Sequence, residues 1–293
     1  MKLTPFRLHR PQTVEQASDL LAELGSAAAL YCGGTELLLV AKLGLTDFTD
    51  LIDVKRIEEL AGIDANGELR IGATTTHREL EHSPVVRDHW PSLAAMERHV
   101  GNIRVRNVGT IGGNLCFADP HSDPATYLIA AGAQLIARHG GGAPRKIAVE
   151  AFTRGPYRNA LAAGELLVAV EVPKLSPGSA IVHRKMSFRE RPAITVTTNV
   201  TVIDGGVAEA RLAVGSVGVA PVRLRAAENV LVGADASAPS DEQLLQFAEA
   251  AADEAQPVAD ANGSVGYKRQ LVRVLVRRCA RDAVAEAHGQ AAG

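Results

Sequence analysis

Two glycine pairs, each followed by side chains that can form hydrogen bonds, are the part of this sequence whose residue types and spacing point to chemistry. The first is Cys32-Gly33-Gly34-Thr35-Glu36, and the second is Gly109-Thr110-Ile111-Gly112-Gly113-Asn114. Glycine lets the backbone approach a ligand closely, and unpaired N–H groups at the start of a helix bind phosphate. Two such loops could hold a diphosphate from both sides, although the first has neither the GxGxxG nor the P-loop spacing.

Each loop also has a structural interpretation. The first is compatible with a tight turn from a strand into a helix, with Thr35 as the N-cap residue. Beyond the second loop, Asp123 precedes Pro124 and a short predicted helix. Asp123 is therefore either an N-cap residue followed by proline at the first helical position, or a carboxylate that accepts a hydrogen bond from a ligand hydroxyl.

Two other groups of reactive side chains follow the second loop. Asp119, His121 and Asp123 alternate as metal ligands could, but such alternation is common in a proline-rich loop, and we predict no metal site. Cys116 with His121 could form a nucleophile pair, but no orienting group or oxyanion donor accompanies it. We therefore assign no catalytic residue.

The elements that must position the loops alternate between strand and helix. Residues 27–32 form a short apolar run typical of a buried strand, residues 36–43 a helix, and residues 51–54 a second strand. A helix over 13–23 precedes them. Residues 101–124 are rich in glycine, asparagine, aspartate and proline, and this composition predicts a loop.

The second half of the chain predicts a sheet followed by helices. Apolar residues alternate with threonine and asparagine over 194–202, which is typical of a half-buried strand, and a turn leads into a partner strand over 207–217. Helices are predicted over 241–255 and 265–287. Earlier in the chain, residues 76–79 have the Thr-x-x-Glu spacing of a capping box. The predicted fold class is α+β.

The composition is that of an ordinary globular protein of 293 residues. Apolar residues make up 46% and charged residues 22%, which excludes a largely disordered chain. The net charge of −2 and the aromatic content of 4% do not favour nucleic acid as a partner. The three cysteines are widely spaced and predict free thiols. No segment approaches the ~18 apolar residues of a membrane span, and we expect a cytoplasmic protein.

The two glycine motifs, with Ser122-Asp123 downstream, resemble those of the FAD-binding subunit of the molybdenum hydroxylases. This family includes the FAD domain of xanthine dehydrogenase and the medium subunit of aerobic carbon monoxide dehydrogenase. One departure is Arg191-Pro192-Ala193, which stands where the family often has an acidic pair. The similarity runs through the whole chain, and further matching segments are Leu51-Ile52-Asp53-Val54, Leu166-Leu167, Lys185 with Arg189, and Gly266-Tyr267-Lys268-Arg269.

The resemblance implies an α+β fold with two parts. The first is a two-subdomain, vanillyl-alcohol-oxidase-like FAD-binding domain, expected over residues 1–176 with subdomains over about 1–56 and 57–176. The second is a C-terminal domain over 177–293, built from an antiparallel sheet with helices.

The resemblance also implies an oxidoreductase subunit that carries non-covalently bound FAD and passes electrons to an external acceptor. The electrons would originate at a molybdopterin site on a large partner subunit and arrive through [2Fe–2S] clusters on a small partner subunit. The expected assembly is a dimer of heterotrimers, with no nucleic acid and no membrane span.

The resemblance assigns most cofactor contacts to the two glycine loops. The loop at 32–36 should bind the FAD pyrophosphate, and the loop at 109–114 should contact the pyrophosphate and ribityl chain. Asp123 should bind a hydroxyl, Leu167 should pack near the adenosine, and the cation of Lys185 should approach the flavin. The implied FAD-binding residues are Leu30, Tyr31, Cys32, Gly33, Gly34, Thr35, Glu36, Leu37, Val100, Gly101, Gly109, Thr110, Gly112, Gly113, Asn114, Asp123, Leu167 and Lys185.

Two other functions stay open from the residues themselves. One is a stand-alone flavin oxidase or dehydrogenase with its own substrate pocket. The other is a non-redox module that binds a nucleotide through the glycine loops. Molybdenum and iron in partner chains that co-purify would exclude the first, and a flavin-free preparation that bound a nucleotide would favour the second.

Overall fold

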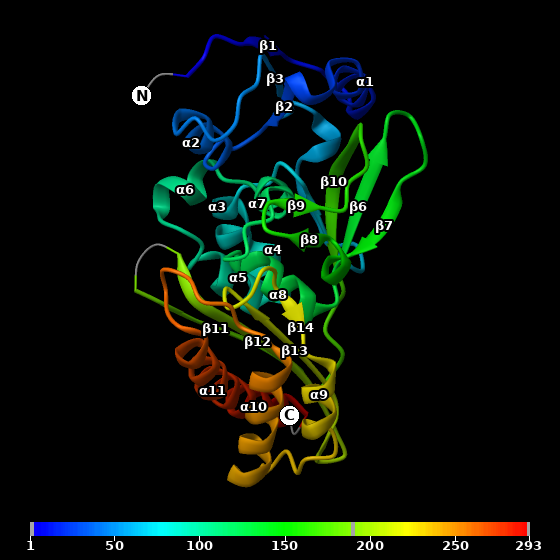
Figure 1. Ribbon diagram of the computed structural model, residues 1–293. Coiled ribbons are helices and arrows are strands. Elements are labelled where there is room, and N and C mark those ends of the chain that lie inside the picture. The colour runs from blue at the N-terminus through cyan, green and yellow to red at the C-terminus, as the bar shows by residue number, and fades with distance from the viewer. Residues whose placement is uncertain (1–2, 189–190, 292–293) are drawn as a thin grey trace. The chain divides into compact units, whose positions relative to one another are not determined.

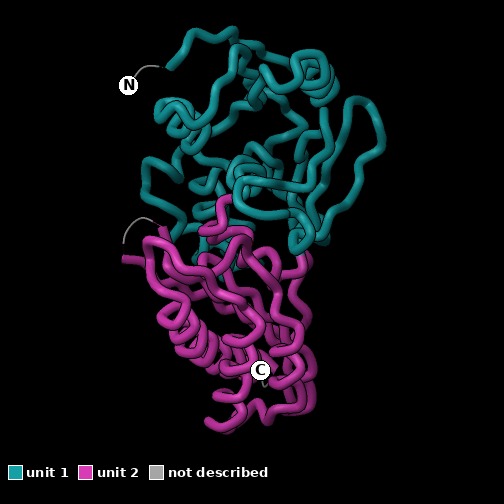
Figure 2. The backbone as a smooth tube through the Cα atoms, in the orientation of Figure 1, with its two compact units in different colours: residues 1–118, 133–172 teal, residues 119–132, 173–293 magenta. Residues whose placement is uncertain are grey.

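The computed structural model describes residues 3–188 and 191–291 (Figure 1), so Arg189 lies outside the described residues. The chain divides into two compact units, which are coloured separately in Figure 2. Unit 1 comprises residues 1–118 and 133–172, and unit 2 comprises residues 119–132 and 173–293. The domain limits given above rest on the sequence and stay predictions.

Unit 1 begins with a small parallel sheet that carries the first glycine loop. Its strand order is β1 (Arg7–His9), β3 (Asp50–Asp53) and β2 (Ala28–Tyr31). The first glycine loop follows β2 and leads into α2 (Leu37–Lys42), which returns the chain to β3. This confirms the predicted order of strand, glycine turn, helix and strand.

Helix α1 (Val14–Leu24) joins this sheet to the rest of unit 1. Thr13 caps the helix, because its side chain accepts a hydrogen bond from the Gln16 N–H. Val14 and Ala17 are fully buried and pack in one cluster with Ile52 of the small sheet and with apolar residues of a second, larger sheet. The amphipathic pattern over 13–23 therefore predicted this helix correctly.

The larger sheet of unit 1 is antiparallel and has the strand order β4-β5-β10-β6-β7. The central strand β10 is buried along nearly its whole length and pairs with β5 and β6, and in Figure 1 β6 lies between β10 and β7. A separate hairpin pairs β8 with β9. The bounds are β4 (Ile63–Asp64), β5 (Leu69–Gly72), β6 (Gln134–His139), β7 (Arg145–Ala148), β8 (Thr153–Gly155), β9 (Arg158–Asn159) and β10 (Glu165–Val172), with 3-10 turns η1 (Gly25–Ala27), η2 (Glu58–Leu60) and η3 (Val149–Ala151).

Short helices, each begun by a capping residue or a proline, fill the middle of unit 1. They are α3 (His77–His82), α4 (Pro84–His89), α5 (Pro91–Glu97), α6 (Ile103–Val108) and α7 (Ile111–Phe117). Thr76 and Glu79 form the predicted capping box, in which the side chain of each accepts a hydrogen bond from the backbone N–H of the other.

The prediction that residues 101–124 form a loop is wrong, because α6 and α7 lie within it. Asn102 and Thr110 cap these helices through their side-chain oxygens. The N–H of Gly112 also donates to the carbonyl of Ala73, at 3.0 Å. Capping and a long-range backbone contact therefore outweigh the low helix propensity of glycine and asparagine in this segment.

Unit 2 is a four-stranded antiparallel sheet covered by helices. Its strand order is β11 (Ser179–Ser187), β12 (Pro192–Ile203), β13 (Gly206–Gly215) and β14 (Val222–Arg223). One face packs against α9 (Arg225–Leu231), α10 (Asp241–Glu254) and α11 (Val265–Ala291), which form the apolar core of this unit. The predicted α+β class and the C-terminal antiparallel sheet with helices are confirmed.

Helix α8 (Asp123–Ala131) packs on the other face of this sheet. The hydroxyl of Thr126 lies 2.9 Å from that of Thr195, and both residues are fully buried. The alternation over 194–202 predicted a strand with one exposed face, and this is wrong for Thr195 and Thr197, which have no exposed surface. The alternation of apolar and polar residues within one strand cannot show that a helix from a distant part of the chain, α8, covers its second face.

Among residues 3–188 and 191–291, the structure contains no helix that is both long and apolar enough to pass through a membrane.

The capping box of α3 yields a stability prediction. We expect Thr76→Ala to lower the free energy of unfolding of unit 1 by about 1 kcal/mol, because the N–H of Glu79 loses its acceptor. Thr76→Ser keeps the hydroxyl and should stay within a few tenths of a kcal/mol of the wild type. Urea unfolding can be followed by fluorescence of the single tryptophan, Trp90, which is buried in unit 1. Equal stability of the alanine and serine variants would contradict this assignment.

Candidate functional site

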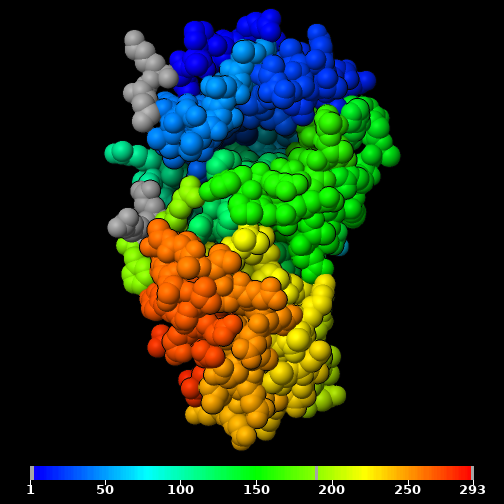
Figure 3. Space-filling model, in the orientation of Figure 1, coloured from blue at the N-terminus to red at the C-terminus, as the bar shows by residue number. Residues whose placement is uncertain are grey.

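A cavity of about 320 Å³ lies within unit 1 and is lined by both glycine loops. Figure 3 shows the surface hollowed between the blue N-terminal elements and the green strands of this unit. The remaining lining comes from β2, the residue after β3, η2, the segment after β5, the start of β10, and helices α3, α6 and α7. The predicted FAD-binding residues that line this cavity are Leu30, Cys32, Gly33, Gly34, Thr35, Glu36, Leu37, Gly109, Thr110, Gly112, Gly113, Asn114 and Leu167.

The two glycine loops touch through their backbones. A Cβ atom added to Gly33 would lie 2.3 Å from the carbonyl oxygen of Val108 and 2.8 Å from the Cα of Gly109. Contacts this short with backbone atoms cannot be relieved by a rotamer change. Glycine at position 33 is therefore required for the close approach of the loops.

The two loops differ in which backbone N–H groups they leave free. In the part of the chain that the structure describes, the N–H groups of Gly34, Thr35 and Leu37 donate to no protein acceptor. Gly34 has a φ of +70°, a conformation that glycine adopts without strain. The first loop thus presents several free donors within a few residues.

In the second loop the corresponding donors are already used. Ile111 N–H donates to the carbonyl of Thr75 at 3.0 Å, and Gly113 N–H donates to the hydroxyl of Thr110 at 3.1 Å. A Cβ on Gly112 would lie 2.6 Å from the carbonyl oxygen of Ala73. This glycine therefore allows α7 to pack against the end of β5, and the loop offers close backbone approach rather than free donors.

Two cap assignments made from the sequence are corrected by the structure. The N-cap of α2 is Glu36 rather than Thr35, and no side chain caps this helix. The N-cap of α8 is Ser122, whose hydroxyl accepts a hydrogen bond from the N–H of Ala125, so Asp123 occupies the first helical position. Proline follows at the second position, where its missing N–H costs nothing.

Asp123 and Lys185 form an ion pair in unit 2. The Nζ of Lys185 lies 2.8 Å from Oδ2 of Asp123, and the two side chains are 16% and 6% exposed. The other carboxylate oxygen, Oδ1, is buried and has no hydrogen-bond partner among the described residues. His183 Nε2 lies 3.9 Å from that oxygen, and His183 Nδ1 lies 2.8 Å from the hydroxyl of Thr197.

Three of the predicted contacts lie elsewhere in unit 1. Tyr31 lines a second cavity of about 350 Å³, together with the cation of Lys55, which lies 4.1 Å from the centre of the Tyr31 ring. Val100 and Gly101 line neither cavity, and the carbonyl of Val100 accepts a hydrogen bond from Arg106. The cofactor roles given to these residues stay predictions.

The alternating acidic and histidine residues after the second loop form ion pairs. Asp119 pairs with Arg191, and His121 lies 3.0 Å from Asp119 and 3.4 Å from Asp260. The fully buried Lys268 pairs with Asp260 at 2.7 Å. Arg191, which departs from the family pattern, therefore neutralises an acidic residue of the same unit.

Several residues that line the main cavity were not predicted from the sequence. Thr74 lies in the segment after β5, and His77 is the first residue of α3. Leu60 and Leu166 add apolar surface to the lining. The capping box at residues 76–79 was a usable signal for His77, because it fixes this residue at the first helical position. No local pattern shows that Leu60 and Leu166 meet at one cavity.

The contact between the two glycine loops predicts how a methyl group added at position 33 changes the stability of unit 1. Gly33→Ala should destabilise unit 1 by about 1–3 kcal/mol, because the added carbon forces the two backbones apart. Gly266→Ala is the control, since a Cβ at that helical position meets no atom within 4 Å. The control should be neutral or slightly stabilising. Thermal unfolding measures both, and equal melting temperatures of the two variants would refute the contact.

The two thiols that line the cavity, Cys32 and Cys116, should be chemically inert. Burial raises the pKa of Cys116 to about 12, and burial also raises the pKa of Cys32 and brings that of Cys279 to about 12. A raised pKa keeps a thiol protonated and weakly nucleophilic at pH 8. We expect negligible iodoacetamide labelling of the folded chain and full labelling after denaturation, measured by mass spectrometry. Rapid alkylation of Cys116 in the folded chain would contradict the expected protonation.

Comparisons with known proteins agree with this geometry. Residues 4–175 match the family model described as the FAD binding domain in molybdopterin dehydrogenase, and residues 187–283 match the CO dehydrogenase flavoprotein C-terminal domain. The carbon monoxide dehydrogenase medium chain of Hydrogenophaga pseudoflava is 31% identical, over 93% of this chain and 95% of that protein. The xanthine dehydrogenase FAD-binding subunit of Escherichia coli O157:H7 is 29% identical, over 96% of this chain and 97% of that protein.

Comparison with solved structures shows similarity to chains of the same kind of enzyme. Carbon monoxide dehydrogenase from Hydrogenophaga pseudoflava matches with a TM-score of 0.93 at 31% identity, over 98% of this chain and 99% of that chain. Quinoline 2-oxidoreductase from Pseudomonas putida 86 matches with a TM-score of 0.90 at 26% identity, over 98% of this chain and 100% of that chain. The chain therefore belongs to the FAD-binding oxidoreductase subunits of the molybdenum hydroxylases.

Proposed function

We propose that this chain is the electron-transfer subunit of a molybdenum hydroxylase complex. It would hold FAD non-covalently, receive electrons from [2Fe–2S] clusters on a small subunit, and pass them to an external acceptor. The electrons would originate at a molybdopterin site on a large subunit, where the substrate is hydroxylated. Membership of the FAD-binding family and the cavity of unit 1 support this proposal.

The free N–H groups of the first glycine loop are the observation that carries the cofactor assignment. Gly34, Thr35 and Leu37 line the cavity, and their N–H groups have no acceptor among the described residues. Buried or partly buried N–H groups require partners, and phosphate oxygens are acceptors of matching charge. The diphosphate of FAD would satisfy several of them together.

The rest of the cavity fits the apolar parts of the cofactor. Leu60, Leu166 and Leu167 are almost fully buried and line the cavity from η2 and β10. Apolar surface of this kind favours a planar aromatic ring, such as adenine, over water. When bound, FAD supplies the redox chemistry, and this chain binds it, orients it and excludes water.

We also propose that Asp123 and Lys185 contact the cofactor. The buried Oδ1 of Asp123 lacks a hydrogen-bond donor among the described residues, and a ligand hydroxyl would supply one. Lys185 forms an ion pair with this carboxylate. Its ammonium group would stabilise a negatively charged, reduced flavin.

The partner subunits complete the proposed function. A large molybdopterin subunit and a small [2Fe–2S] subunit would form a heterotrimer with this chain, and two heterotrimers would associate. We place the complex in the cytoplasm, where free thiols such as those of Cys32, Cys116 and Cys279 persist.

Purification of the chain with its native partners tests the proposal. We expect flavin absorption bands, one FAD per chain, and molybdenum and iron in the partner chains. Flavin without metals or partners would instead support a stand-alone flavin oxidase. A chain that binds no flavin after FAD is added would overturn both functions and leave the nucleotide-binding module.

The Lys185 assignment predicts a change in the flavin potential. Lys185→Met should lower the midpoint potential by on the order of 30 mV, because the reduced flavin loses a stabilising cation. Lys174→Met is the control, since Lys174 is exposed. Spectroelectrochemical titration of each FAD-loaded chain measures the potential. An unchanged potential in the Lys185 variant would remove this residue from the flavin environment.

A further inference from the structure

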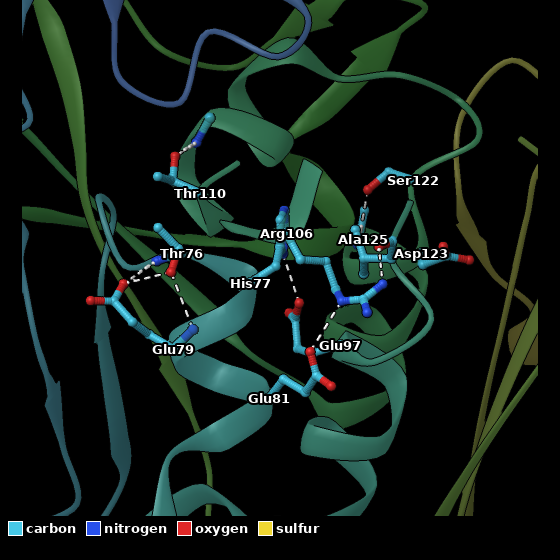
Figure 4. A network of polar contacts seen from close by, with 12 residues as sticks. Thr76, His77, Glu79, Glu81, Glu97, Arg106, Thr110, Ser122, Asp123 and Ala125 are labelled. Carbon is cyan, nitrogen blue, oxygen red and sulfur yellow. Dashed lines mark hydrogen bonds and ion pairs between the residues drawn. The ribbon is translucent and has the colours of Figure 1, made fainter. Parts of the chain in front are cut away.

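His77 is a buried imidazole of the FAD cavity to which no role has been given. It is the first residue of α3, it is 2% exposed, and it lines the cavity of unit 1. Its Nδ1 lies 2.6 Å from Oε2 of Glu97, a contact visible in Figure 4. Among the described residues its other ring nitrogen, Nε2, has no partner, and it is not one of the fully enclosed atoms.

We propose that His77 donates a hydrogen bond from Nε2 to the diphosphate of FAD, and that Glu97 is the positioning residue that holds the ring. The inference rests on the proposed cofactor site and adds a contact from α3 to the two glycine loops. It assigns a role to the one histidine of the described cavity lining.

The charge of the cavity supports a diphosphate contact. The charged or ionisable groups that line it, apart from thiols, are Glu36 and His77, and no lysine or arginine is among the described lining residues. A diphosphate brings negative charge into this space. The nearby cation of Lys55 lines the second cavity and is already paired with Asp53 at 3.5 Å. His77 is therefore the side chain of this lining that can supply a charge-assisted donor.

The contact with Glu97 occupies Nδ1 of His77 and leaves Nε2 as the nitrogen that can meet a ligand. Glu97 has no exposed surface, and a lone buried carboxylate is costly unless it is paired. A hydrogen bond from Nε2 to a diphosphate requires a proton on that nitrogen, and with the proton that Nδ1 and Glu97 share, the pair is then neutral overall. Carboxylates orient histidine rings in this way at many functional sites.

The backbone places the free edge of the His77 ring beside the glycine loops. The N–H of His77 donates to the carbonyl of Gly109 at 3.0 Å. A Cβ on Gly109 would lie 3.3 Å from Cδ2 of His77, the ring atom bonded to Nε2. Gly109 in turn lies against Gly33, whose loop carries the free N–H groups. The imidazole edge and these donors therefore belong to one continuous surface.

Two substitutions of His77 separate a cofactor contact from a structural role. His77→Asn keeps an amide near the position of Nδ1, so it can still bond to Glu97 but presents no donor to the cavity. His77→Gln places its amide nitrogen near the position of Nε2 and loses the Glu97 contact. FAD binding to the full-length, deflavinated chain is measured by quenching of flavin fluorescence, and melting temperatures are recorded without FAD.

We expect His77→Asn to raise the Kd for FAD by about 10- to 100-fold, the effect of removing a hydrogen bond to a charged group. His77→Gln should bind FAD more tightly than His77→Asn, although it is the less stable protein. ADP, which has the diphosphate but no flavin, should lose affinity for the asparagine variant by a similar factor. His9→Gln is the matched control, because His9 forms a comparable pair with Asp50 at 2.7 Å outside the cavity lining.

Three results would overturn the inference. The first is wild-type affinity of His77→Asn for FAD and ADP. The second is a loss for FAD alone, which would place the contact at the flavin instead of the diphosphate. The third is an FAD affinity that follows melting temperature in both variants, which would make the role structural. In each case the wild-type chain still binds FAD, so the proposed function would stand. A wild-type chain that binds no FAD would overturn the proposed function as well.

Discussion

The backbone contact between Gly33 and the Val108–Gly109 segment is the constraint on which the cavity of unit 1 depends. Any side chain at position 33 would meet backbone atoms at 2.3–2.8 Å and separate the two loops. Because the loops meet there, the donors of the first loop and the side of α7 line one cavity. The first loop keeps its N–H groups for a ligand, while the second uses them to fix α7 against Ala73 and Thr75.

The charge of the cavity also depends on which residue types are absent from its described lining. Its described lining contains no lysine or arginine, and the thiol of Cys116 stays neutral because burial raises its pKa to about 12. In the proposed site, backbone dipoles and one buried imidazole would therefore provide the attraction for an anion. Under the proposed function, such a site would bind the diphosphate of FAD without a strongly charged surface.

The local parts of this fold could be predicted from the sequence, and the long-range parts could not. Helix α1 and the strand–turn–helix at the first loop follow from apolar periodicity and glycine placement. Helices α6 and α7 were missed because their stability depends on caps and on contacts with Ala73 and Thr75. Likewise, the burial of Thr195 depends on α8, and the role of His77 depends on Glu97, which lies 20 residues away.

Hydrogen exchange with and without FAD tests most directly whether the first glycine loop binds the cofactor through its backbone. We predict that the N–H groups of Gly34, Thr35 and Leu37 become protected when FAD is added. Those of Ile111, Gly112 and Gly113 are already bonded within the chain and should change little. If the N–H groups of the first loop exchange equally fast in the FAD-saturated chain, the central claim is wrong.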